Sequence, residues 1–333
     1  MKVPSEQKIA VLLMAHGGPD SLDDIEPFLR HIMKERVPSP EVVAQIKERY
    51  RLIGGKSPLL EITRQQAAAL DAELNKRAPR FQVYIGMRHW SPFIKDTVQQ
   101  ILQDQPAHLI AISLAPHYSK LSVGAYIQAL KTAIADLCVL SVPTSKYFPK
   151  VMITDDFSAA GSNLPTTFVE TWYDQPLLLD AFAKKVKEAL AAYPEATRAS
   201  VPILFTAHSL PERILAEGDP YPKELAATVA GIVQRLGPVD HRFAYQSRGM
   251  IPGKWLGPEV DEVLNEMASR GERHLLIAPV GFVCDHVEIL YDINILYKQT
   301  AKEKGIELRR TESLNASPLF IQSLAAVVHA HLP

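Results

Sequence analysis

Residues Ile203–Arg213 read Ile-Leu-Phe-Thr-Ala-His-Ser-Leu-Pro-Glu-Arg, and this stretch decides the expected fold. An apolar run that stops at small residues, one histidine and a proline is typical of a buried parallel strand. His208 then lies at the carboxyl edge of a sheet, where open α/β folds bind ligands. A lone histidine at a strand end is more often held by a local hydrogen bond, so a functional role for His208 needs support from elsewhere.

A sequence pattern that occurs twice gives the first support for a functional role of His208. Residues 11–20 read Val-Leu-Leu-Met-Ala-His-Gly-Gly-Pro-Asp, so Ala-His-x-x-Pro followed by an acid occurs at His16 and again at His208. Each copy follows an apolar run and precedes a helix-like segment. We therefore predict an α/β protein of two similar Rossmann-like, doubly wound domains, each a parallel sheet flanked by helices, with a cleft between them.

The alternation of apolar runs and amphipathic segments predicts the individual elements. Strands are expected at residues 9–15, 82–87, 108–115, 201–207, 241–245, 274–278 and 306–310, and helices at 21 onward, 41–52, 63–77, 96–102, 122–137, 176–193, 223–236, 259–270 and 318–331. We assign residues 1–137 and a C-terminal helix at 314–333 to the first domain, and 138–313 to the second. Residues 141–167 are rich in Pro, Ser, Thr and Gly, and we interpret them as an interdomain connection or an excursion over the cleft.

Two acidic residues give the second support for a functional role of His208. Pro279–Asp292 follows another apolar run and places Glu288 and Asp292 four residues apart, on one face of a helix. Neighbouring carboxylates repel each other and gain little unless they handle protons or cations. Together with His208 they form a candidate metal and proton site.

Basic and hydroxyl-bearing side chains cluster around the glycines that end the helix expected at 41–52. The group comprises Arg49, Tyr50, Arg51, Lys56 and Ser57. Such a cluster is most often a solvated face, but it also suits the carboxylates of an anionic ligand. Tyr126 stands near the start of the helix at 122–137.

Composition excludes several classes of protein. The 333 residues carry a formal net charge of −1, which argues against a nucleic-acid partner. The cysteines, Cys138 and Cys284, form no CxxC pattern, so we expect no disulfide scaffold and a cytoplasmic protein. No secretory signal is visible, and the longest apolar runs fall short of the roughly 20 residues of a spanning helix.

The motifs together resemble those of the ferrochelatases, which insert ferrous iron into a porphyrin. They are Arg49-Tyr50, Ile53-Gly54-Gly55-Lys56-Ser57-Pro58-Leu59, Thr206-Ala207-His208-Ser209-Leu210-Pro211, Gly218-Asp219-Pro220-Tyr221-Pro222, Trp255-Leu256-Gly257-Pro258, Gly281-Phe282, Asp285-His286-Val287-Glu288 and Glu312-Ser313-Leu314-Asn315. They extend over nearly the whole chain. The resemblance implies a chelatase fold with the porphyrin in the cleft, and a lyase of heme biosynthesis.

The resemblance also implies roles for residues. His208 and Glu288 match the metal-handling pair of the family, and Asp292 the next step of an acidic ridge along a π-bulged helix, where Leu296 replaces the usual third carboxylate. Iron enters as a substrate, and we expect no further cofactor. We expect no iron-sulfur cluster either, because the chain lacks the cysteine-bearing tail of animal members. The expected partners are porphyrin and ferrous iron, and the expected state is a monomer.

Several stretches resemble the coproporphyrin branch of the family. They are Ala115–Ser119, Ser122–Tyr126 and Trp172–Asp174. In that branch Arg49, Tyr50, Ser57 and Tyr126 match ligand-contacting positions. Two departures stand out: His16 replaces a tyrosine that faces the porphyrin iron, and Met33 replaces an arginine for a propionate.

These expectations leave alternatives open. We predict that His208 and Glu288 flank the incoming iron on one ring face while Asp292 passes protons outward, and that His16 is either an axial iron ligand on the opposite wall or a turn histidine. The favoured substrate is coproporphyrin III. The alternatives are protoporphyrin IX, a cobalt chelatase of other tetrapyrroles, and a binding protein for heme or metal that does not turn over.

Overall fold

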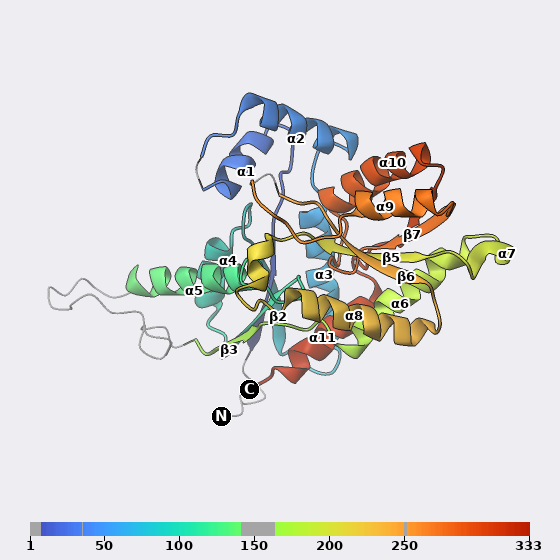
Figure 1. Ribbon diagram of the computed structural model, residues 1–333. Helices are drawn as coiled ribbons and strands as arrows, with labels where there is room; N and C mark the ends of the chain where they lie inside the picture. The colour runs from blue at the N-terminus through green and yellow to red at the C-terminus, as the bar shows by residue number, and fades with distance from the viewer. Residues whose placement is uncertain (1–7, 35, 141–163, 250–251) are drawn as a thin grey trace.

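The computed structural model describes residues 8–34, 36–140, 164–249 and 252–333. Its strands are β1 (Ile9–Ala15), β2 (Phe81–Met87), β3 (His108–Ser113), β4 (Thr166–Val169), β5 (Ile203–His208), β6 (His241–Gln246), β7 (His274–Ala278) and β8 (Glu307–Arg310). Its helices are α1 (Ile25–Ile32), α2 (Pro40–Leu52), α3 (Leu59–Leu74), α4 (Ile94–Asp104), α5 (Val123–Leu140), α6 (Pro176–Ala191), α7 (Glu195–Arg198), η2 (Glu212–Leu215), α8 (Tyr221–Leu236), α9 (Val260–Ser269), η3 (Glu288–Tyr297), α10 (Lys298–Glu303) and α11 (Pro318–Ala330). Strands and helices alternate along the chain (Figure 1).

The strands form two parallel sheets of the same topology. The first has the order β2-β1-β3-β4 and the second the order β6-β5-β7-β8. In both sheets the first strand of the half pairs in parallel with the second and third, and the fourth joins the third. The predicted pair of similar Rossmann-like halves is confirmed, and His16 and His208 occupy equivalent positions directly after, or at the end of, β1 and β5.

One hydrophobic core joins the two halves. Alternate residues of β1, such as Val11, and of β5, such as Phe205, belong to the same buried cluster together with apolar residues of α3, α6, α8 and α11. The opposite face of the first sheet packs on α4 and α5, and that of the second on α9, η3 and α10 (Figure 1). Both faces of each sheet are thus covered, as parallel strands require.

The structure differs from the sequence-based expectations at some element boundaries. Helix α1 begins at Ile25 rather than near residue 21, and α3 begins at Leu59, directly after Pro58. The short strand β4 and the helices η2 and α7 were not predicted.

The irregular segment assigned to 141–167 lies outside the described residues up to 163, and its last two residues begin β4. β4 falls within the range that we assigned to the second domain, yet it pairs with β3 of the first sheet. The proposed domain boundaries stay a prediction.

Candidate active site

His208 and Glu288 form a hydrogen-bonded pair at the edge of the second sheet. His208 ends β5, Glu288 begins η3, and His208 Nδ1 lies 2.9 Å from Glu288 Oε2. A carboxylate only accepts, so Nδ1 carries the hydrogen and Nε2 is the atom left to take a proton or bind a metal. Burial lowers the pKa of His208, but the charge and hydrogen bond of Glu288 outweigh it, and the net pKa is raised.

The carboxyl group of Glu288 is ionised in this setting. Burial alone raises its pKa, yet the charge and hydrogen bond of His208, followed by those of His286, hold the pKa well below its usual range. His286 Nε2 lies 3.9 Å from the same Oε2 atom. The pair therefore keeps a carboxylate beside an imidazole of increased basicity, an arrangement suited to proton transfer and metal binding.

Gln246 fixes the spacing between these two elements. It lies opposite His208 in the β5/β6 register and is 2% exposed. Its amide group donates to the backbone oxygen of Glu288 at 3.0 Å and accepts from the Thr206 hydroxyl at 2.7 Å. One side chain thereby ties β5, β6 and the start of η3 together.

Asp292 lies one step further along η3, where the helix has π geometry. Its carboxylate accepts a hydrogen bond from the Ser247 hydroxyl, and Ser247 has a φ of 58° in the left-handed region. Burial raises the pKa of Asp292 to about 6, and the charge of Glu288 adds to the rise. Asp292 can therefore exchange protons near neutral pH. Leu296, at the following step, is 42% exposed.

His16 lies on the wall formed by the first sheet. Its Nδ1 is 3.0 Å from the carbonyl oxygen of Gly17, so Nδ1 carries the hydrogen and Nε2 keeps its lone pair. The residue is exposed to solvent, yet desolvation by the surrounding protein lowers its pKa, and the charge of Glu288 in the other half offsets this only in part. His16 is therefore neutral at pH 7 and presents a free nitrogen.

His89 lies next to His16. The two ring centroids are 4.6 Å apart, and His31 packs on the other side of His89 at 5.7 Å. Burial, followed by the charges of His16 and Arg88, lowers the pKa of His89 to about 2, so this ring too is neutral.

The predicted ligand-contacting residues gather around the same place. Arg49 lies 5.2 Å above the ring of Tyr291 on η3, and its positive charge acts to lower the pKa of Asp292. Burial raises the pKa of Tyr50, and the negative charge of Glu288 adds to the rise. α2 and η3, which carry these residues, are in contact across the two halves.

Ser57 and Tyr126 complete this group on the first wall. Ser57 packs so closely on the turn after His16 that a Cβ on Gly18 would come within 2.5 Å of its hydroxyl. Tyr126 is buried, with Arg88 5.8 Å above its ring, and Arg88 also acts on His16. All the predicted site residues therefore lie in one neighbourhood, while their individual roles stay predictions.

Gln246, Ser247 and His89 were not predicted as site residues. Gln246 ends β6, Ser247 directly follows it, and His89 lies two residues after β2. Strands β6 and β2 are the neighbours of β5 and β1, and this place near a strand end is the sequence signal that points to the three residues. Within the described parts of the chain, no group of three or more His, Cys, Asp or Glu side chains is arranged to hold a metal ion.

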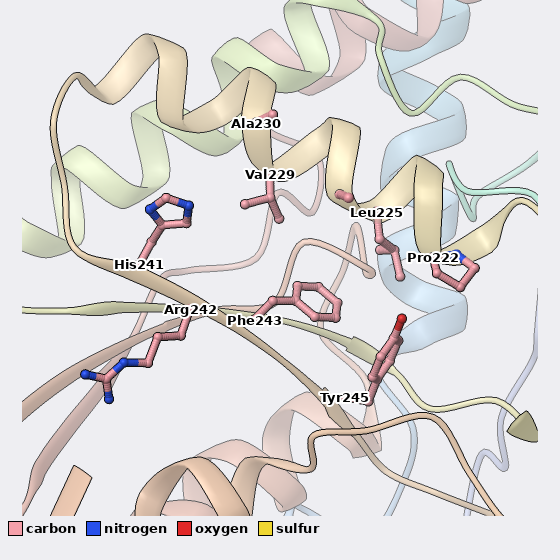
Figure 2. Close-up of a pocket in the computed structure, with 9 residues that line it drawn as sticks. Pro222, Leu225, Val229, Ala230, His241, Arg242, Phe243 and Tyr245 are labelled. Atoms are coloured by element: carbon pink, nitrogen blue, oxygen red, sulfur yellow. The ribbon is translucent and has the colours of Figure 1, made fainter. Parts of the chain in front are cut away.

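A separate cavity of about 420 Å³ lies between α8 and β6. Figure 2 shows Leu225, Val229 and Phe243 along it, with the Tyr245 hydroxyl toward one end and His241 toward the other. None of the predicted site residues lines it, so it is not the candidate active site.

Solved structures identify the class of fold. SirB from Bacillus subtilis, solved with Fe3+, matches with a TM-score of 0.56 at 10% identity, covering 98% of this chain and 96% of that one. CbiX, described as the terminal enzyme for biosynthesis of siroheme in denitrifying bacteria, matches with a TM-score of 0.51 at 10% identity, covering 98% and 100%. The molecule thus has the two-domain fold of the chelatases.

Sequence comparison is more specific than the fold. The Ferrochelatase family model matches residues 8–332, so the chain belongs to the ferrochelatase family. A ferrochelatase of Herpetosiphon aurantiacus is 41% identical over 96% of this chain and 98% of its own length. A coproporphyrin III ferrochelatase of Bacillus pumilus is 38% identical over 97% of both chains. Among the described helices, none combines the length and the apolar character needed to cross a membrane.

Proposed function

We propose that the protein inserts ferrous iron into coproporphyrin III in heme biosynthesis, and that His208 and Glu288 carry out the step. The observation that carries this proposal is the 2.9 Å contact between His208 Nδ1 and Glu288 Oε2 at the sheet edge, where the charge of Glu288 also acts on His16 in the first half. Membership of the ferrochelatase family supports the reaction, and ferrous iron enters as a substrate with no resident cofactor.

The chemistry of metallation matches this arrangement. Two pyrrole N–H protons leave while a hydrated ferrous ion loses water and binds the ring nitrogens. His208 Nε2 takes the two protons one after the other, and the carboxylate of Glu288 stabilises the imidazolium that forms each time. Asp292, with a pKa of about 6, passes each proton on toward solvent before the next one is taken. Histidine nitrogen and carboxylate oxygen are also ligands that ferrous iron accepts.

His16 has a different task because it is neutral. Its Nε2 keeps a lone pair that could bind the iron of the product as an axial ligand. Replacement His16→Phe should change the absorption spectrum of the bound product, since a nitrogen ligand is lost. An unchanged spectrum would leave His16 as a turn histidine.

The preference for coproporphyrin III has support from relatives and from charge. Relatives from Bacillus pumilus and a Geobacillus strain, 38% and 37% identical, carry the name coproporphyrin III ferrochelatase. Coproporphyrin has more carboxylates than protoporphyrin IX, and each needs a donor or solvent. Arg49, Ser57 and Arg88, beside the site, are donors of the kind that such groups require.

The proposal is tested by anaerobic iron insertion with coproporphyrin III and protoporphyrin IX offered separately at equal concentrations. We expect a higher kcat/KM with coproporphyrin III. Preference for protoporphyrin IX would overturn the choice of substrate but keep the reaction. Stoichiometric binding without repeated turnover on either porphyrin would overturn the reaction and favour a binding protein.

A further inference from the structure

A chain of hydrogen bonds runs from the first half of the molecule to the backbone of His208. The Ser119 hydroxyl and the Lys120 N–H each donate to Asp219 Oδ2 at 2.9 Å. Asp219 Oδ1 accepts from the Tyr221 N–H at 3.1 Å. The Tyr221 hydroxyl then donates to the backbone oxygen of His208 at 3.0 Å.

These contacts are directional, and the two hydroxyl groups among them belong to buried residues. Ser119 is 0% exposed and Tyr221 is 6% exposed. Asp219 takes part in no ion pair with the residues that the structure describes, so neutral donors hold its carboxylate in one orientation. Hydrogen bonds of this kind depend on geometry, so a shift of Ser119 or Asp219 would move the His208 backbone. The effect on His208 is therefore mainly one of position and not of charge.

Two further contacts fasten the same region to the first half. Glu224 on α8 accepts from the Tyr118 N–H at 2.6 Å and from the Thr171 hydroxyl at 2.8 Å. The His117 ring and the Thr228 hydroxyl lie 2.8 Å apart. The loops that follow β3 and β4 therefore hold α8, the helix that begins at Tyr221, at two further points along its length.

His208 is sensitive to such a constraint. It is the last residue of β5, so the strand ladder no longer holds its carbonyl group, while its ring must stay within hydrogen-bonding distance of Glu288. A displacement of the backbone by a fraction of an ångström changes where Nε2 points. Reactions that depend on aligned groups lose rate steeply with such displacements.

We propose that Tyr221 and Asp219 are positioning residues for His208, and that they set its place relative to the wall formed by the first sheet. The inference rests on the proposed function, because it concerns the rate of the same iron insertion. Neither residue needs to touch the porphyrin or the iron.

Tyr221→Phe tests the first part, because it removes only the hydroxyl that donates to His208. We expect kcat for iron insertion to fall about tenfold, with KM for the porphyrin unchanged and the melting temperature lowered only as far as the loss of one buried hydrogen bond requires. The matched control is Tyr193→Phe, which removes a buried hydroxyl that donates to the backbone oxygen of Leu275 near the start of β7 at 3.0 Å, and it should keep wild-type kcat. Equal kcat in Tyr221→Phe and wild type, or the same loss in both variants, would overturn the inference.

Ser119→Ala tests the link to the first half. It removes one donor to Asp219 and should lower kcat two- to threefold, with little further effect in the Tyr221→Phe background, because both changes act on one series of contacts. Fully multiplicative effects would overturn the link. A wild-type protein without turnover would instead contradict the proposed function, so the two failures are distinguishable.

Discussion

The two nitrogen atoms of His208 allow a direct test of its proposed role. Nδ1 is held by Glu288, so Nε2 is the atom that takes the proton in the proposed mechanism. His208→Ala should lower kcat by about 10² to 10⁴-fold, the range typical of a lost acid-base group, and leave porphyrin affinity largely intact. Fluorescence quenching measures binding, and anaerobic insertion measures turnover. His241→Ala, an exposed histidine on the neighbouring strand, is the control, and normal turnover in His208→Ala would refute the assignment.

The pair of His208 and Glu288 should also appear in the pH dependence of stability. The lowered pKa of Glu288 contributes stability above its unfolded pKa, and this is lost as pH falls through the folded pKa. The raised pKa of His208 contributes below its unfolded pKa, and this is lost as pH rises through the folded pKa. Their joint contribution is therefore greatest between about pH 4.5 and 6.5.

Glu288→Gln tests this window. It should lower the free energy of unfolding by about 1 kcal/mol near pH 5.5, and by less at pH 8.5, because His208 loses its charge progressively as pH rises through its raised pKa. Thermal melts at both values, with the exposed Glu195→Gln as control, measure the difference. A loss that is the same at both pH values would mean that the pair is not ionised as described.

Whether a site residue could be predicted from the sequence depended on its chemical type and on its position after an apolar run. His208, Glu288 and Asp292 are titratable and stand after apolar runs, so their pattern predicts chemistry. Gln246 carries no charge, and its importance depends on the β5/β6 register, which no local pattern contains. Tyr221 stands in a recognisable motif, but its contact with the His208 carbonyl depends on how α8 packs.

At the scale of elements, η3 holds Asp292 at a buried position, and this burial makes its carboxyl group a weaker acid. Its pKa of about 6 is raised above the unfolded value of 3.8, so the ionised form is disfavoured in the folded protein. Asp292 therefore reduces stability progressively as pH rises from about 4 to above 6. Asp292→Asn should raise the free energy of unfolding at pH 8 by on the order of 2 kcal/mol and have little effect at pH 4.

Urea denaturation at both pH values checks the effect of Asp292→Asn, and Asp261→Asn, exposed on α9, is the control. Equal stability of wild type and Asp292→Asn at pH 8 would mean that the carboxyl group is not destabilised by burial. The same variant should lower kcat if Asp292 passes protons outward.

Most long elements were predictable because each has a clear apolar period, as in α3, or a short continuous apolar run, as in β1. The strand β4 has only four residues and is held by pairing with β3, so its own sequence has little signal. The π geometry of η3 follows from no periodicity either. It was expected only through the resemblance to ferrochelatases.

At the scale of the whole molecule, the common core predicts that both halves unfold together. Phe320 on α11 is 0% exposed and packs near Trp172, whose indole donates to the backbone oxygen of Ser113 at the end of β3. Phe320→Ala should lower the free energy of unfolding by about 3 to 5 kcal/mol and keep a single transition. Gln322→Ala, exposed on the same helix, should change it little. Two separate transitions in calorimetry would show that the halves are independent.

The repeated Ala-His-x-x-Pro pattern was enough to predict two similar halves. It could not predict that they share one core, because an apolar period shows that a face is buried but not which partner covers it. Val11 and Phe205 lie far apart in the sequence, and only the packing of α3, α6 and α11 between them brings them into one cluster.

The place of α11 has a consequence for synthesis on the ribosome. α11 contacts both α3 and α6, yet it follows every other described element in the sequence. While the nascent chain emerges from the ribosome, the apolar faces of α3 and α6 stay uncovered, because α11 is translated after both helices. Folding of either half is then completed only after α11 has left the exit tunnel, and a chain stalled before Pro318 exposes a surface that chaperones recognise.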